Sequence, residues 1–209
     1  MKLQISYDFT NLPEALEIAK KTAEFADILE VGTQLIYAKG IEAIHEFKKQ
    51  FPNKDILADA KVVDRVDEII PLLAKAGAKY ITVLSGTSNS IIQHASTLAH
   101  ALKAKIMLDL LDITSLGQAA HDAQVLDVDT VLFHNPHDVV PTAENLEDWE
   151  AVRGNTDLPI FIGGRINKTN ITTILERKPQ GIIVGEAITK AKDPTKEAED
   201  FKNLISKKE

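Results

Sequence analysis

Short apolar runs rich in β-branched residues alternate with longer amphipathic segments along the whole chain. Each run is too short for a helix and too continuously apolar for a strand with one exposed face, so the runs predict parallel strands covered on both faces. The predicted strands are Leu3–Tyr7, Ile28–Val31, Ile56–Ala58, Tyr80–Leu84, Lys105–Leu108, Thr130–Phe133, Pro159–Ile162 and Gly181–Val184. This alternation is typical of an α/β fold.

The segments between the strands predict amphipathic helices. Apolar residues recur at helical spacing at Leu12, Ala15, Leu16, Ala19 and Ala23, at Val66, Ile69, Ile70 and Leu73, and at Ala198, Phe201, Leu204 and Ile205. Asn11 before Pro13 and Asp193 before Pro194 each predict an N-cap followed by a proline in the first turn. Gly77 predicts the C-terminal end of the second of these helices.

Strand–helix units repeat through all 209 residues, which is close to the lower size limit of about 200 residues for a (β/α)8 TIM barrel. We therefore predict a single barrel domain over residues 1–209. A doubly wound open sheet is the competing fold. No linker or low-complexity segment suggests a second domain.

The composition narrows the range of partners. The chain has 31 acidic and 24 basic residues, a net charge of −7, and no Lys/Arg cluster offsets this excess, so nucleic acid is not an expected partner. The sequence shows neither a signal peptide at its start nor an apolar stretch of about 20 residues, so we expect a cytoplasmic protein that does not cross a membrane. Cysteine is absent, which excludes cysteine nucleophiles and thiolate metal ligands.

Charged residues stand where the predicted strands end, and in a (β/α)8 barrel these ends share the face that carries the active site. The residues are Asp8, Glu30, Asp59, Asp64 and Asp109, with Lys61 and His134. Singly, an Asp after a strand is more often a helix N-cap, and a lone His is usually a structural hydrogen-bonding residue. Together, five carboxylates in one barrel mouth repel one another more strongly than one lysine can balance. The pattern predicts a hard divalent cation on oxygen ligands, most simply magnesium, Mg²⁺.

Two features refine this prediction. Asp59 and Lys61 are two residues apart, so on an extended chain their side chains point the same way. Glycines follow the last two strands, as Gly163-Gly164-Arg165 and as Gly185. Glycines allow backbone N–H groups to approach a ligand, and a following helix N-terminus favours an anion, so these loops predict a phosphate site. The alternative is that the glycines only make tight turns, and Glu186 adds a negative charge that the phosphate interpretation does not explain.

Two motifs resemble a known family. Leu57–Asp64, with the sequence LADAKVVD, resembles the Asp-x-Lys-x-x-Asp signature of the orotidine-monophosphate decarboxylase suprafamily. Ile28–Thr33, with the sequence ILEVGT, resembles the second-strand motif of the branch that contains 3-hexulose-6-phosphate synthase and 3-keto-L-gulonate-6-phosphate decarboxylase. The similarity extends over nearly the whole chain, from Leu3 to Pro194.

The resemblance implies a Mg²⁺-dependent barrel that acts on a keto-sugar phosphate through a metal-stabilised enediolate. Glu30 and Asp59 match the metal ligands of the family. Asp8 and Lys61 match the polar network around the substrate.

The resemblance also implies acid/base residues and a homodimer. Asp109 and His134 match the acid/base positions. Asp64 matches a residue that these dimeric enzymes contribute across the subunit interface to the neighbouring site.

Two positions favour the synthase, which adds ribulose 5-phosphate to formaldehyde. The decarboxylase instead makes its enediolate by losing CO₂. Decarboxylases carry Glu at the end of the fifth strand and Arg three residues after the sixth-strand histidine, where this chain has Asp109 and His137. We therefore expect a carbon–carbon lyase of the synthase type, with the decarboxylase as the alternative.

Other positions depart from the synthase pattern. Asp64 is followed by Arg65–Val66 rather than by small residues. Asn135–Pro141 stands where a Thr-Gly segment and a loop rich in Gln, Ala and Gly are usual, and Glu186 stands where Gly, Ser or Arg is usual. These changes leave open a different keto-sugar phosphate, or a catalytically silent barrel that binds a sugar phosphate. An isomerase of the ribulose-phosphate epimerase type is disfavoured, because such sites usually hold zinc with two strand-end histidines and only His134 qualifies.

Overall fold

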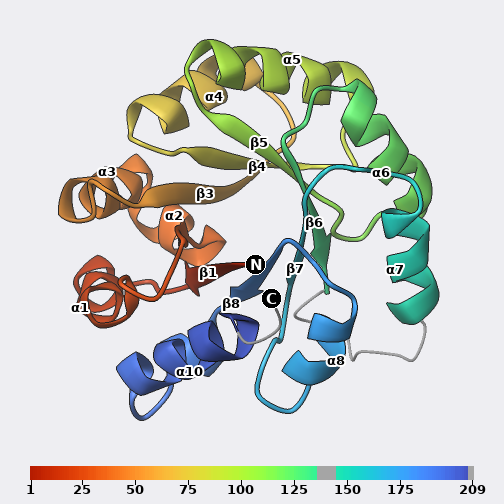
Figure 1. Ribbon diagram of the computed structural model, residues 1–209. Helices are drawn as coiled ribbons and strands as arrows, with labels where there is room; N and C mark the ends of the chain where they lie inside the picture. Colours follow the sequence, from red (N-terminus) through yellow and green to blue (C-terminus); the bar gives the residue numbers. More distant parts are fainter. Residues whose placement is uncertain (136–144, 207–209) are drawn as a thin grey trace.

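Eight parallel strands close into a barrel in the computed structural model, which describes residues 1–135 and 145–206 (Figure 1). Each strand pairs with its neighbours in the sequence, and β1 pairs with β8 to close the ring. The strands are β1 (Lys2–Tyr7), β2 (Ile28–Val31), β3 (Asp55–Val62), β4 (Tyr80–Leu84), β5 (Lys105–Asp109), β6 (Thr130–His134), β7 (Ile160–Gly163) and β8 (Gly181–Val184). The predicted (β/α)8 barrel is confirmed, and the open sheet is wrong.

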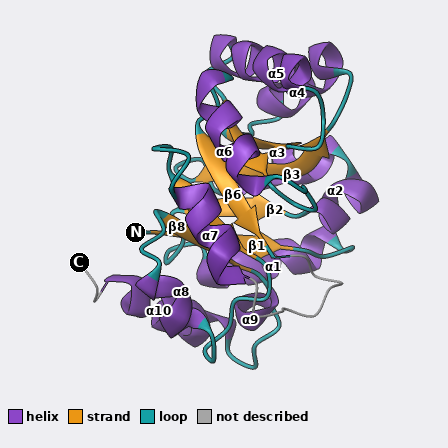
Figure 2. Cartoon of the chain, turned by 90° about the vertical axis from the view of Figure 1, so that its right-hand side faces the viewer, coloured by secondary structure: helices purple, strands orange, loops and turns teal. Residues whose placement is uncertain are grey.

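Helices cover the outside of the barrel (Figure 2). They are α1 (Leu12–Thr22), α2 (Thr33–Lys39), α3 (Ile41–Gln50), α4 (Val66–Lys75), α5 (Asn89–Ala101), α6 (Leu116–Val125), α7 (Asn145–Arg153), α8 (Ile171–Glu176), α9 (Glu186–Thr189) and α10 (Pro194–Ser206). Within the described part of the chain, none of these helices is long and apolar enough to cross a membrane.

The predicted helix ends are confirmed. The Asn11 side chain accepts a hydrogen bond from the Glu14 N–H at 3.1 Å, and Asp193 accepts one from the Lys196 N–H at 3.1 Å. Gly77 follows α4 with φ of +110°, a conformation that suits glycine. One core prediction is wrong, because Leu204 is 36% exposed. Helix α10 turns Ala198, Phe201 and Ile205 to the core instead.

The interior of the barrel is built in two layers. Most strands contribute one apolar residue to a buried inner cluster, formed by Ile28, Leu57, Tyr80, Met107, Leu132, Phe161 and Ile183. Because side chains alternate along a strand, the residue two positions later faces the same way, one layer closer to the C-terminal end. These later positions are Glu30, Asp59, Thr82, Asp109, His134, Gly163 and Gly185. The apolar layer thus lies directly below the layer that carries the polar residues, and we call it the floor.

At the opposite end of the barrel, the Asp129 side chain, just before β6, contacts both α5 and the start of β5. Asp129 Oδ2 lies 2.9 Å from His100 Nε2 and accepts a hydrogen bond from the Ile106 N–H at 2.9 Å. The hydrogen bond with Asp129 raises the pKa of His100, the charges of Asp129 and Asp127 add to this effect, and burial opposes it. The protonated imidazole is therefore favoured in the folded protein.

We expect this contact to make stability depend on pH. Since the folded-state pKa of His100 lies above the unfolded value of about 6.5, its contribution is fully present below that value and is lost as pH rises through the folded-state pKa. The pair is partly exposed, so the contribution is at most about 1 kcal/mol, or roughly 2–4 °C in Tm. Thermal unfolding of H100Q followed across this pH range should show a smaller fall in Tm than the parent. Parallel curves would contradict the assignment.

Candidate active site

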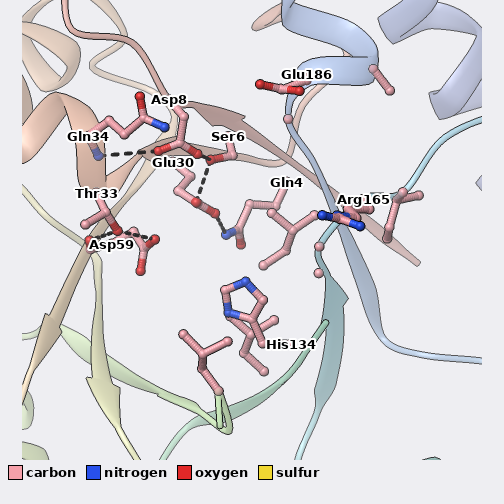
Figure 3. Close-up of a pocket in the computed structure, with 18 of the residues that line it drawn as sticks. Gln4, Ser6, Asp8, Glu30, Thr33, Gln34, Asp59, His134, Arg165 and Glu186 are labelled. Atoms are coloured by element: carbon pink, nitrogen blue, oxygen red, sulfur yellow. Dashed lines mark hydrogen bonds between the residues drawn. The ribbon is translucent and has the colours of Figure 1, made fainter. Parts of the chain in front are cut away.

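An open cavity of about 950 Å³ lies at the C-terminal ends of the strands (Figure 3). Most of the predicted site residues line it, namely Asp8, Glu30, Asp59, Lys61, His134, Gly163, Gly164, Arg165 and Gly185. Leu132 and Ile183 of the apolar layer form part of its floor. The two other predicted residues do not line the cavity. Asp109 is fully buried behind His134, and Asp64 is exposed on the loop between β3 and α4.

Glu30 is buried among oxygen atoms. Ser6 Oγ donates to Glu30 Oε1 at 2.6 Å, and Gln4 Nε2 donates to Glu30 Oε2. Burial raises the pKa of Glu30 to about 8, and the charges of Asp59 and Asp8 add to the increase, although both hydrogen bonds lower it. The ionised form of Glu30 is therefore disfavoured unless a cation lies beside it.

Asp8 shares the same network from the end of β1. Ser6 Oγ also lies 2.9 Å from Asp8 Oδ2, and the Gln34 N–H approaches Asp8 Oδ1 at 3.5 Å (Figure 3). Gly32 permits this arrangement, because a Cβ atom at this position would lie 2.2 Å from Asp8 Oδ1. The glycine of the second-strand motif thus makes room for a carboxylate.

Asp59 connects three neighbouring side chains. Its Oδ1 accepts a hydrogen bond from Thr82 Oγ1 at 2.9 Å, and its Oδ2 accepts hydrogen bonds from Thr33 Oγ1 at 2.7 Å and from Lys61 Nζ. Lys61 Nζ also lies 3.8 Å from Asp109 Oδ2. Burial lowers the pKa of Lys61, but the charges of Asp59 and Asp109 outweigh burial and raise it. Lys61 is therefore held in its charged form.

Lys61 reaches the cavity by a different route from the one expected. β3 extends to Val62, beyond the predicted end, and its register with β4 shifts between Ala58 and Val62. Lys61 has φ of +46°, and its N–H donates to Thr82 Oγ1 at 2.9 Å. Asp59 and Lys61 do face the same cavity, but a bulge places them there. The regular alternation expected from the sequence is wrong at this point.

Buried Asp109 pairs with His134, which is partly exposed to the cavity. Both Asp109 oxygens lie 3.0 Å from His134 Nδ1, and Asp109 Oδ1 accepts a further hydrogen bond from the Leu111 N–H at 3.0 Å. A carboxylate at Nδ1 fixes a proton there, so Nε2 of the neutral ring is the atom available for proton transfer. Burial lowers the pKa of His134, but the hydrogen bond and charge of Asp109 outweigh burial and raise it.

Arg165 and Glu186 lie at the other end of the cavity from Asp59 (Figure 3). Gly164 has φ of +92°, and a Cβ atom there would lie 2.0 Å from the Asn135 carbonyl oxygen, so this turn requires glycine. Gly185, by contrast, leaves 3.6 Å to its nearest neighbour. The glycines therefore shape the turn after β7 and leave the turn after β8 open to a ligand.

The expected contribution of helix N-termini at this end is weak. After β7 the next helix begins only at Ile171, and after β8 the helix α9 has four residues. A helix dipole needs aligned peptide units, so neither helix offers much positive potential. Helix dipoles would therefore contribute little to the binding of an anion here. Glu186 is also accounted for, because Lys190 Nζ pairs with it.

The model of the "Orotidine 5'-phosphate decarboxylase / HUMPS family" matches residues 1–201. The chain belongs to this family. A 3-hexulose-6-phosphate synthase of Bacillus subtilis (strain 168) is 31% identical over 207 residues, covering 98% of this chain and 99% of the relative. The crystal structure of a 3-hexulose-6-phosphate synthase from Salmonella typhimurium is 29% identical, covers 100% of both chains and has a TM-score of 0.92.

A more distant structure shows the fold alone. It is a KGPDC from Streptococcus mutans, 21% identical over 99% of this chain and 97% of that chain, with a TM-score of 0.91. Together with the synthases, these similarities confirm the resemblance seen in the sequence. This member of the family is a carbon–carbon lyase.

Sequence reasoning missed several side chains of this family member's site. Thr33 and Thr82 hold Asp59, while Gln4 and Ser6 hold Glu30. Thr82 lies two residues after Tyr80 of the inner apolar cluster, a relation that only the closed barrel shows. His137, which favoured the synthase, lies outside the described residues, as does most of the altered loop.

The donor set fits Mg²⁺. Glu30 and Asp59 face the cavity from neighbouring strands, and buried Gln4 Oε1 has no hydrogen-bond partner in the described structure. Residues 1–135 and 145–206 contain no group of three His, Cys, Asp or Glu side chains that could hold a metal ion. Mg²⁺ does not need such a group, since it commonly binds one or two carboxylates and keeps several waters. The raised pKa of Glu30 marks the place where a cation would relieve repulsion.

Proposed function

We propose that the chain is a Mg²⁺-dependent lyase of the 3-hexulose-6-phosphate synthase type, which adds ribulose 5-phosphate to formaldehyde. The observation that carries this proposal is the Asp109–His134 pair, which lies beside Lys61. His134 and Lys61 line the same cavity as Asp59 and Glu30. This arrangement places a base beside positive charge, as enediolate formation requires. Asp109 and the names of the full-length relatives favour the synthase over the decarboxylase.

The reaction starts with proton transfer. In this proposal, His134 Nε2 removes the C1 proton of the keto-sugar phosphate, and Asp109 stabilises the resulting imidazolium. Charged Lys61 stabilises the developing negative charge on the enediolate oxygen. When held by Glu30 and Asp59, Mg²⁺ supplies further positive charge beside the substrate oxygens.

Bond formation completes the cycle. The C1 carbon of the enediolate attacks the carbonyl carbon of formaldehyde, which forms a carbon–carbon bond and leaves a negative charge on the formaldehyde oxygen. The imidazolium of His134 returns a proton to this oxygen, so the base is regenerated. Asp109 keeps the ring oriented in both steps.

We place the phosphate of the substrate between the loops of Gly163, Gly164 and Arg165 and of Gly185. We also propose a homodimer in which Asp64 reaches the neighbouring site. Its exposure on the loop after β3, beside a Val63 that is 49% exposed, supports such a role.

Product analysis tests the proposed function. Ribulose 5-phosphate and formaldehyde with Mg²⁺ should give a hexulose phosphate, detectable by NMR, and ribulose 5-phosphate alone should exchange its C1 proton in D₂O. Release of CO₂ from 3-keto-L-gulonate 6-phosphate, without condensation, would show the decarboxylase instead. Exchange without either product would indicate another electrophile. Binding without exchange would show a catalytically silent barrel.

A further inference from the structure

Helix α9 places two opposite charges on the wall of the cavity. Glu186 begins the helix and Lys190 follows its last residue, so the two side chains lie four positions apart on one side of the turn. Lys190 Nζ pairs with Glu186 Oε1, and both residues line the cavity. Their side chains are 60% and 54% exposed, so an entering ligand can reach them.

This pair changes the charge balance at one end of the cavity. Arg165 and Lys190 are cations there, against the single acid Glu186 among the described residues that line this end. The opposite end carries Asp8, Glu30 and Asp59 (Figure 3). A ligand with a dianionic group and a hydroxyl-bearing chain therefore has a preferred direction, with the anion towards Arg165 and Lys190.

Helix N-termini would contribute little to holding an anion at this end. The helix after β8 has four residues, and the turn after β7 is followed by no helix until Ile171. A charge-assisted hydrogen bond from a lysine supplies what these short helices lack. Lys190 has three N–H donors, so it can exchange its contact with Glu186 for one with a phosphate.

We propose that Lys190 binds the phosphate of the substrate and that Glu186 competes with the phosphate for it. This inference rests on the proposed function, because the ligand is the phosphate of the same keto-sugar phosphate. Glu186 holds Lys190 on the cavity wall in the free enzyme. When the phosphate arrives, it displaces the carboxylate, so Glu186 lowers the affinity and Lys190 raises it.

The variants K190M, E186Q and the double variant test this competition. K190M removes the cation and leaves Glu186 facing the phosphate, so we expect the Kd for ribulose 5-phosphate to rise by on the order of 10- to 100-fold. E186Q should bind more tightly than the parent, by about 2- to 5-fold, a typical effect of one nearby charge. The double variant should fall between the two. Because Glu186 lies apart from His134 in the cavity (Figure 3), kcat should change much less than KM.

K192M is the matched control. Lys192 lies two residues beyond Lys190, does not line the cavity, and carries the same charge to be removed. Kd values are measured by calorimetry with ribulose 5-phosphate and with inorganic phosphate, and Tm values confirm that each variant is folded. Equal Kd values for K190M and K192M, or weaker binding by E186Q, would overturn the inference.

The two proposals fail in different ways. If Lys190 is only a partner of Glu186 on the helix, K190M keeps the affinity and the condensation activity of the parent, and only this inference falls. If the proposed reaction is wrong, the parent forms no hexulose phosphate, yet phosphate binding still depends on Lys190. The binding measurements need no turnover, so they separate these results.

Discussion

Replacing Asp109 by Asn is expected to lower kcat about 10²- to 10³-fold, with little change in the affinity for the sugar phosphate. Asp109 is fully buried and both its oxygens face His134 Nδ1, so in the proposed reaction it orients the ring and stabilises the imidazolium. Asn has nearly the same shape but lacks the charge. The loss therefore falls on proton transfer, not on binding, and steady-state kinetics of the variant measure it.

The pH profile gives a second measure of the same pair. His134 must be neutral to accept a proton, so kcat falls as pH drops below its pKa, which Asp109 raises. In D109N the pKa of His134 falls, because the charge that raised it is gone while burial remains. The acid limb should therefore move to lower pH. An unmoved limb, or full activity, would contradict the assigned role.

Two further variants are controls for this prediction. H134Q removes the base itself and should lose as much activity as D109N. The double variant should be little worse than H134Q, because residues that act as a unit are not additive. If the loss of kcat in the double variant equals the loss in D109N multiplied by the loss in H134Q, Asp109 does not act through His134. Equal Tm values confirm that the losses do not come from unfolding.

Removing Mg²⁺, or replacing Glu30 by Gln, is expected to abolish turnover. Glu30 and Asp59 are the carboxylates that face the cavity from neighbouring strands, and chelation should be reversed by added Mg²⁺. E30Q keeps the size and shape of the side chain but loses the charge. We expect it to bind Mg²⁺ at least about 10-fold more weakly in calorimetry, which requires no turnover. Unchanged affinity in E30Q would show that the metal binds elsewhere.

The raised pKa of Glu30 makes this prediction sharper. With a pKa of about 8, Glu30 holds a proton at neutral pH, so Mg²⁺ binding should release about one proton there. The sign for stability follows from the same shift. A folded-state pKa above the unfolded value of about 4.3 stabilises the metal-free protein below that value, and this stability is lost as pH rises through about 8. E30Q should lose both effects, whereas E24Q, on the surface, should keep both.

The polar layer of the barrel could be predicted because polarity changes along the strands. Continuous apolar runs stop at Asp59, Asp109 and His134, where the strands pass from the apolar layer to the polar layer, although β3 itself continues to Val62. Thr82 gave no such signal, because it lies inside an apolar strand whose two faces are both covered. Only the closed barrel shows which of its residues face inward.

Other features had no sequence signal at all. The bulge at Lys61 places a lysine at positive φ, where glycine is the usual marker. The pair of Glu186 and Lys190 depends on a four-residue helix, which is too short to show a periodic pattern. Lys61, Glu186 and Lys190 are candidate site residues because they line the cavity, which the sequence alone does not show.

The two layers of the barrel interior have different effects on fold and reaction. The apolar layer stabilises the fold, and the polar layer above it carries the candidate site residues. Asp109 and Thr82 each stand two residues beyond an apolar residue of the floor, so replacing either removes almost none of the apolar area that the floor buries. New chemistry can therefore arise by single substitutions at a small cost in folding. The fold has accordingly outlasted much of the sequence, since a chain only 21% identical still has a TM-score of 0.91.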